Sequence, residues 1–342
     1  MRHCVDFDRP DRVPRDLATL PATFAAFGEE TVRAFRERWP TDIVQCFAGR
    51  RRKPVLVRGD PHAVGQCRDE WGCVFENLQA GYMGEVKAPL LSDWSRLEDL
   101  HVPAELLDVD ADVVNGFCRQ EEHFVFASGW PRPFERIQFL RGSENVYLDL
   151  AEGSAELKRL IGIVHDFFVR QCEIWARTNV DALVIMDDWG AQRSLLVRPS
   201  MWRELFKPLY ADYARVAHEH GKKMFMHSDG HITDILDDLI EIGIDAINAQ
   251  LFVMDIEELG RRFRGRITFW GGMCVQRVLS RGTTADAAAA VRRVVENLWL
   301  PEGGAIAQMP LYPTVPLENA ETVFRTWDEL TSPPAAEVPG QT

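Results

Sequence analysis

The feature that most constrains the fold of this chain is a regular alternation of short apolar runs and helical patterns between residues 123 and 330. Each run is apolar at consecutive positions, which is typical of parallel strands covered by helices on both faces. The runs predicted as strands lie at 124–126, 182–186, 223–226, 244–247, 267–270 and 305–307. Helical periodicity predicts helices at 155–178, 201–219, 232–242, 255–263, 285–300 and 319–330. This order predicts an α/β fold.

The N-terminal part of the chain has a less regular pattern. A helix is predicted at 20–39, where a proline ends it, and a short buried strand follows at 42–47. Residues 51–95 contain short β pieces separated by glycine, which predict a small antiparallel excursion from the main sheet.

The strands of the main sheet are expected to close into a barrel. About seven are visible in the pattern, and we expect an eighth within 89–122 or 135–150. Because no glycine-rich phosphate-binding motif follows the first strand, a (β/α)8 TIM-type barrel is favoured over an open sheet. We predict a single barrel domain over 1–330 and a disordered tail over 331–342, which is rich in proline and alanine.

The charge balance and the cysteines exclude several classes of protein. With 52 acidic and 39 basic residues the net charge is −13, so neither nucleic acid nor an anionic membrane surface is an expected partner. No apolar run approaches the ~20 residues that cross a bilayer, and the charged N-terminus is unlike a secretory signal. Seven scattered cysteines without a CxxC pair do not indicate disulfides. We therefore expect a cytoplasmic protein that acts on a small molecule.

Polar side chains follow the ends of several predicted strands. In a TIM barrel the active site lies at the C-terminal ends of the strands, so these side chains are expected to converge. Asp187 and Asp188 follow one strand, and His227 and Asp229 follow the next. We take these four as catalytic candidates, because an imidazole and paired carboxylates can serve as acid, base or metal ligand. Other strand ends supply the substrate-binding candidates Asn248, Gln250 and Gln308.

Each of these side chains also has a structural interpretation. His227 could be held by Asp229 or by a backbone carbonyl, without any chemical role. Asp187 could cap a helix while Asp188 points to solvent. Because the whole set of side chains is expected at one end of the barrel, a functional site is favoured over these structural interpretations.

Several segments resemble the uroporphyrinogen decarboxylase superfamily. They are GKKMFMHSDGHITDILDDLIEIGIDAINAQ from residue 221 with the later ITFWGGMCVQ, DALVIMDDWGAQRSLLVRPSMWRELFKPLY at 181–210, the N-terminal RPDRVP, PFERIQFLRGSENVYLDL at 133–150 and VPLENAETVF at 315–324. The resemblance extends from about residue 8 to 330, and it implies a distorted (β/α)8 barrel. One branch of this superfamily decarboxylates a tetrapyrrole without a cofactor. Another transfers methyl groups between corrinoid proteins and thiols with a zinc held by His-x-Cys and a later Cys.

The chain departs from both branches. It lacks the Arg-Gln-Ala-Gly-Arg segment with which the decarboxylase grips carboxylates, and Gln308-Met309-Pro310 stands where that enzyme has Gly-His-Gly. The zinc motif of the methyltransferases reads His227-Ser228-Asp229 here. His227 and Asp229 alone are too few ligands for a zinc site, which Asp187, Asp188 or Cys274 would have to complete.

Three functions are weighed, and the first is favoured over the second because the chain shows neither a corrinoid domain nor a set of thiolate zinc ligands. The first is a carboxy-lyase acting on a small carboxylated substrate. Such an enzyme needs cations that hold the carboxylate of the substrate, and the arginines considered are Arg132, Arg136, Arg141 and Arg193. Of these, Arg136 and Arg141 are the substrate-binding candidates. The alternative is a methyltransferase acting on a small O- or N-methyl compound, with a corrinoid protein as partner and with or without zinc. The third is a non-catalytic barrel. Whether any cofactor is bound, and whether the chain forms a homodimer, is left open.

Overall fold

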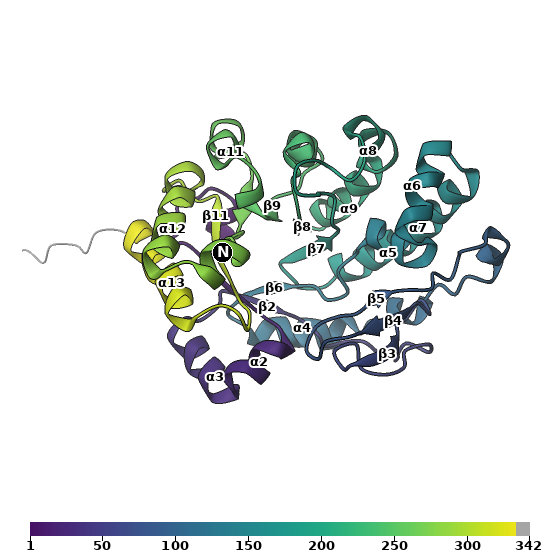
Figure 1. Ribbon diagram of the computed structural model, residues 1–342, viewed down its shortest axis with the longest axis horizontal. Coiled ribbons are helices and arrows are strands. Elements are labelled where there is room, and N and C mark those ends of the chain that lie inside the picture. Colours follow the sequence, from purple (N-terminus) through teal and green to yellow (C-terminus); the bar gives the residue numbers. More distant parts are fainter. Residues whose placement is uncertain (333–342) are drawn as a thin grey trace, which may run out of the picture.

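The computed structural model describes residues 1–332, in which eight parallel strands form a barrel with helices around it (Figure 1). The barrel strands are β1 (Arg15–Thr19), β2 (Ile43–Gln45), β6 (Phe124–Phe126), β7 (Ala182–Met186), β8 (Lys223–Ser228), β9 (Ala246–Ala249), β10 (Thr268–Trp270) and β11 (Ala305–Leu311). The predicted TIM-type fold is confirmed. Of the predicted tail, Thr331 is the last residue of a helix, and 333–342 lie outside the described residues.

The strands follow one another around the barrel in chain order, and each paired neighbour is parallel. Only the junction of β1 and β2 lacks a ladder among the described residues. There the Asp42 N–H donates to the Arg15 carbonyl at 2.8 Å. The Asp42 carboxylate also accepts from the Arg15 N–H at 2.7 Å. The barrel is therefore nearly closed, and its distortion lies at this junction.

The eighth strand is β1, and the expectation that it lies within 89–122 or 135–150 is wrong. Those two stretches form short 3₁₀ helices and α-helices instead. β1 does not show the apolar pattern of a buried strand, because it contains charged side chains that have partners within the fold. Arg15 pairs with Asp328 at 2.6 Å, and the Asp16 carboxylate accepts the indole N–H of Trp270 at 2.8 Å.

The helices surround the barrel on its outer side (Figure 1). The predicted helix at 20–39 is two helices, because Gly28 between them has a φ of 79° that ends the first. The α-helices are α1 (Arg2–Val5), α2 (Pro21–Phe27), α3 (Glu29–Arg38), α4 (Ala111–Gln120), α5 (Pro133–Arg141), α6 (Ser143–Glu152), α7 (Ala155–Ala176), α8 (Pro199–Leu205), α9 (Lys207–Glu219), α10 (Leu236–Glu241), α11 (Ile256–Phe263), α12 (Thr284–Leu298) and α13 (Leu317–Thr331).

The predicted excursion is a three-stranded antiparallel sheet. It consists of β3 (Gly65–Arg68), β4 (Val74–Asn77) and β5 (Glu85–Val86). Trp71 in the β3–β4 connection is buried and meets the ring of Phe167 on α7 edge-on, with the centroids 5.1 Å apart. This contact holds the small sheet against the helices that cover the barrel.

Aromatic side chains fill the interior of the barrel. The ring of Phe126 lies 4.9 Å from that of Phe225 and 5.4 Å from that of Trp270, measured between centroids. These rings belong to an apolar cluster inside the strands, and a larger cluster lies between the strands and the helices. Because these rings fill the interior, a ligand site of the barrel is expected above them, at the C-terminal ends of the strands.

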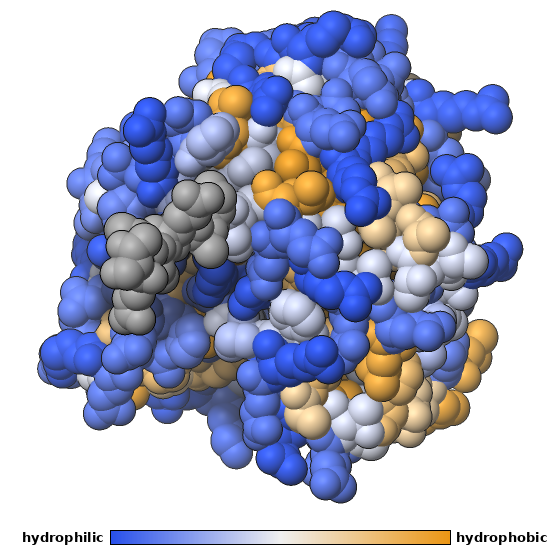
Figure 2. Space-filling view, turned by 90° about the vertical axis from the view of Figure 1, so that its left-hand side faces the viewer, coloured by the Kyte–Doolittle hydropathy of each residue, from blue (hydrophilic) through white to orange (hydrophobic). Residues whose placement is uncertain are grey.

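The outer surface is mainly hydrophilic on the face formed by α12 and α13, where apolar side chains are scattered (Figure 2). Among residues 1–332, no helix combines the length and the apolar character that crossing a bilayer requires.

Candidate functional site

A cavity of about 1300 Å³ opens at the C-terminal end of the barrel. We call it the barrel cavity. Phe126 and Trp270, at the top of the aromatic interior, form part of its lining. The polar residues of its wall come from strands all around the barrel, and they include Asp16, Gln45, Asp188, His227, Asp229, Asn248, Gln250 and Gln308. Most of them lie at or just after the C-terminal end of a strand, whereas Asp16 lies near the start of β1 and Gln308 in the middle of β11. This is the place where TIM-barrel enzymes carry their active sites.

His227 lies at the centre of a three-residue cluster. In the ladder between β7 and β8, His227 of β8 lies opposite Met186, the last residue of β7. Asp188, two residues further along the chain, therefore lies next to His227. The Nε2 atom of His227 is 3.4 Å from an Asp188 oxygen and 3.7 Å from an Asp229 oxygen. One ligand atom from each of the three residues falls within 4.8 Å of the others, a spacing that could hold a metal ion. We call this set the His227 cluster.

Asn248 fixes the orientation and the tautomer of His227. The Asn248 amide nitrogen donates to the Trp270 carbonyl and, at 3.0 Å, to Gln308 Oε1. The Asn248 amide oxygen therefore faces His227 Nδ1, at 2.5 Å. Because that oxygen can only accept, Nδ1 carries a proton, and a neutral His227 presents the lone pair of Nε2 to the carboxylates.

The cluster shifts the pKa values of its members in different directions. Burial alone would lower the pKa of His227, but Asp188 and Asp229 outweigh it and raise that pKa above its ordinary value. Burial opposes the ionisation of Asp188, yet the neighbouring His227 holds the pKa of the Asp188 carboxyl below its ordinary range. Burial raises the pKa of Asp229. The two carboxyl groups beside His227 therefore differ, since Asp188 ionises more readily than Asp229.

Asp187 does not line the barrel cavity, although its position beside Asp188 at a strand end made it a catalytic candidate. It is fully buried and accepts the backbone N–H groups of Phe134 at 2.7 Å and Glu135 at 2.8 Å, as well as the hydroxyl of Tyr210. Both N–H groups belong to the first turn of α5, so Asp187 caps that helix. Burial and the nearby Glu135 carboxylate raise the pKa of Asp187 to about 8.

Two arginines expected to bind substrate also lie outside the barrel cavity. Arg136 is buried and pairs with Asp69 and, at 3.1 Å, with Glu70. Arg141 pairs with Asp149 at 2.7 Å and donates to two backbone carbonyls. Their charges are thus balanced within the fold. Asn248, Gln250 and Gln308, the other substrate-binding candidates, do line the barrel cavity.

Asp16 and Cys274 line the barrel cavity, although neither is among the catalytic or substrate-binding candidates from the sequence. Asp16 lies on β1, the strand without an apolar pattern, and burial raises its pKa. Cys274, considered only as an extra zinc ligand, follows β10 and lines the cavity, but it is not part of the His227 cluster. No local pattern marks Asp16 in the sequence, because it directly follows the charged Arg15.

Comparison with known proteins identifies a family and a fold. The family described as uroporphyrinogen decarboxylase (URO-D) matches residues 84–330. A methyltransferase from Methanosarcina mazei has a similar fold, with a TM-score of 0.64 and 14% identity over 95% of this chain and 96% of that chain. A GH113 beta-mannanase from Alicyclobacillus acidocaldarius matches with a TM-score of only 0.41 and 13% identity, over 95% and 99% of the two chains. No curated protein sequence matches the chain.

Proposed function

Because the chain belongs to the uroporphyrinogen decarboxylase (URO-D) family, we propose that it is an enzyme whose chemistry takes place at the His227 cluster. The reaction that we propose is transfer of a methyl group between a small O- or N-methyl compound and a corrinoid carried by a partner protein. The observation that carries the proposal is the convergence of one imidazole nitrogen and two carboxylate oxygens at the wall of the open barrel cavity. The protein from Methanosarcina mazei with a similar fold is a methyltransferase, and we carry that reaction class over.

The donor set of the cluster is suited to a divalent cation such as zinc. Catalytic zinc sites commonly have three protein ligands and leave a further position open for water or substrate. Here Asp188, His227 and Asp229 would supply the three ligands, and Asn248 would orient the imidazole from behind. A bound cation would polarise the oxygen or nitrogen atom next to the methyl group. Carboxylate ligands are harder than thiolates, so an acceptor other than a thiol is expected.

The remaining polar residues would bind the substrate. Gln308 and Gln250 line the same cavity as the cluster, and their amides can accept or donate hydrogen bonds to a small polar molecule. The Gln250 oxygen already accepts the N–H of Gly230 at 3.2 Å, and its amide nitrogen is directed to the Asp229 carboxylate, so Gln250 would act beside the cluster. A corrinoid protein partner and a cytoplasmic location stay predictions from the sequence, and a homodimer stays open.

A carboxy-lyase is the second candidate. It is favoured by one observation: His227 Nε2 faces two carboxylates, which would hold a protonated imidazole ready to donate to a developing carbanion. It ranks second because Arg136 and Arg141, offered from the sequence as cations for a carboxylate, are engaged in buried ion pairs elsewhere. The cluster itself carries two carboxyl groups, which repel a carboxylate substrate.

Metal binding separates the two candidates. For methyl transfer we expect purified protein to bind one zinc ion per chain in calorimetry, and we expect Asp188→Asn and Asp229→Asn each to weaken binding about tenfold or more. The matched control is Asp16→Asn, since Asp16 lines the same cavity but contacts Trp270 instead of the cluster. Absence of zinc binding would contradict the methyltransferase proposal and favour the lyase.

The orienting role of Asn248 gives a separate prediction. Replacing it by leucine removes the acceptor for His227 Nδ1–H, so the imidazole loses its fixed tautomer. We expect Asn248→Leu to weaken zinc binding about 10- to 100-fold. Gln308→Leu serves as the control, because Gln308 touches Asn248 but not His227, and its loss should have a smaller effect. Equal affinities in Asn248→Leu and in the unchanged protein would show that His227 is oriented by other contacts.

A further inference from the structure

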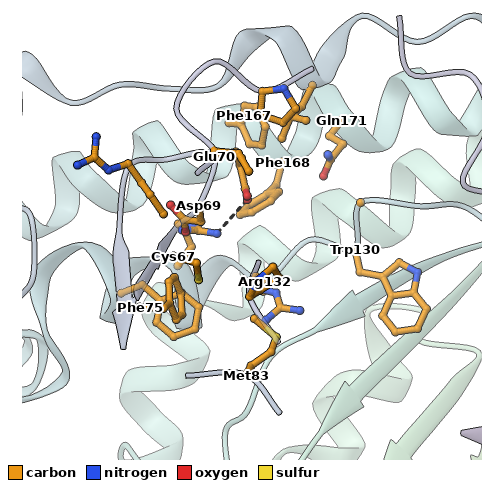
Figure 3. A pocket seen from close by; sticks show the side chains of 18 of the residues that line it. Cys67, Asp69, Glu70, Phe75, Met83, Trp130, Arg132, Phe167, Phe168 and Gln171 are labelled. Carbon is orange, nitrogen blue, oxygen red and sulfur yellow. Dashed lines mark hydrogen bonds and ion pairs between the residues drawn. The ribbon is translucent and has the colours of Figure 1, made fainter. Parts of the chain in front are cut away.

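A second cavity, of about 380 Å³, lies between the barrel and the three-stranded sheet (Figure 3). We call it the sheet pocket. Its lining comes from the loop after β2, the loop after β6, helix α7 and the small sheet. Gln45 and Trp130 line both the sheet pocket and the barrel cavity, so the two spaces are neighbours. None of the three members of the His227 cluster lines the sheet pocket.

The walls of the sheet pocket are aromatic. Phe167 and Phe168 approach it from α7, while Phe75 faces it from β4 and Trp130 closes one side (Figure 3). Rings on several sides of one cavity favour a flat apolar ligand, which can stack or pack edge-on against them. The volume is at the lower end of the ~300–1000 Å³ that small-molecule sites usually have. The pocket therefore suits a molecule with a single ring.

A buried amide without a partner faces this pocket. Gln171 on α7 is only 4% exposed, and its Oε1 atom has no hydrogen-bond partner among residues 1–332. A buried acceptor without a partner destabilises the protein, because it has lost its hydrogen bonds to water. A small rotation of the amide would bring this oxygen to the pocket, where a ligand with a hydroxyl group would supply the missing donor.

Positive charge is in excess around the pocket. Arg136 is balanced by Asp69 and Glu70, as described above. Arg50 and Arg68 also line the pocket, and within the described part of the chain neither has a carboxylate within the 4.0 Å of an ion pair. An anionic ligand would provide the counter-charge that the protein does not.

Gly129 brings the amide and one of these arginines to the same point. A Cβ atom built on Gly129 would lie 2.8 Å from Gln171 Nε2 and 3.4 Å from a terminal nitrogen of Arg50. The two side chains therefore approach one end of the pocket together. The φ of Gly129 is 75°, so a residue with a side chain would be strained here as well as crowded.

We propose that the sheet pocket is a second binding site, specific for a small aromatic carboxylic acid that carries a hydroxyl group next to its carboxylate. The carboxylate pairs with the Arg50 guanidinium, the hydroxyl donates to Gln171 Oε1, and the ring packs between the phenylalanines. A ligand held there lies against Gln45 and Trp130, the two residues of the wall between the sheet pocket and the barrel cavity. This site does not depend on the reaction proposed for the His227 cluster.

The test is calorimetric titration of the full chain, without added metal, with salicylate as the probe. We expect millimolar or tighter binding, about three- to tenfold weaker binding of benzoate, which lacks the hydroxyl, and about tenfold or more weaker binding of 2-hydroxybenzyl alcohol, which lacks the charge. Gln171→Leu should abolish the preference for salicylate over benzoate, and Arg50→Met should weaken both acids about tenfold or more.

Two variants locate the bound ligand. Arg51→Met is the matched control for Arg50→Met, because Arg51 is the next arginine along the chain but pairs with Asp110 at 3.1 Å; it should bind salicylate normally. His227→Ala should also bind salicylate normally if the ligand occupies the sheet pocket. The proposal is overturned if salicylate does not bind, if Arg50→Met binds as well as Arg51→Met, or if His227→Ala loses the binding.

Discussion

Replacing His227 by alanine is expected to abolish turnover and leave the fold intact. The side chain lies at the wall of the barrel cavity and is about 20% exposed, so its removal leaves no closed void. The expected loss of stability is therefore on the order of 1 kcal/mol or less, against ~2–5 kcal/mol for a core deletion. Removing a metal ligand or a general acid–base group costs far more in rate, ~10²-fold or greater.

Zinc affinity measured by calorimetry is the practical readout for His227→Ala, and His123→Ala is the matched control. His123 lines the same cavity, but it pairs with Glu121 at 2.9 Å and is not part of the His227 cluster. The control should keep both the melting temperature and the zinc affinity. If His227→Ala instead lowers the melting temperature and keeps its zinc affinity, the histidine is structural and the chemistry lies elsewhere.

The fold could be predicted where the strands are apolar on both faces. β7 and β8 show this directly, because each has buried apolar residues at consecutive positions. β1 could not be found in this way, since Arg15 and Asp16 are charged and their partners, Asp328 and Trp270, lie far along the chain. A strand whose polar side chains are satisfied by tertiary contacts gives no local signal.

The site could be predicted in part. The rule that strand ends face the mouth of the barrel locates His227, Asp188 and Asp229 at the cavity. It cannot decide which of two adjacent carboxylates points into the mouth, because successive side chains at a strand end point in opposite directions. It also cannot foresee that Arg136 is balanced by Asp69, which lies in the β3–β4 connection, 67 positions away in the sequence.

Replacing Asp187 by alanine is expected to destabilise the protein strongly, in contrast to the same change at Asp188. The Asp187 carboxylate is the acceptor for two N–H groups of the first turn of α5 and for the hydroxyl of Tyr210. Truncation would leave these donors buried and unpaired, at about 1–3 kcal/mol for each group that water cannot reach. We expect the free energy of unfolding to fall by about 3–5 kcal/mol in Asp187→Ala, measured by urea denaturation.

Asp188→Ala is the matched control, since it removes the same group one position along the chain. The Asp188 side chain is 42% exposed, and the backbone N–H that it accepts, from Asp229, lies at the cavity wall, where water can replace it. We therefore expect a loss of about 1 kcal/mol or less in stability, together with the loss of zinc affinity. Similar stability losses in both variants would contradict the assignment of Asp187 to the cap of α5. If only Asp187→Ala lost zinc affinity, the metal ligand would be Asp187, and the two neighbouring carboxylates would have exchanged the roles that their contacts indicate.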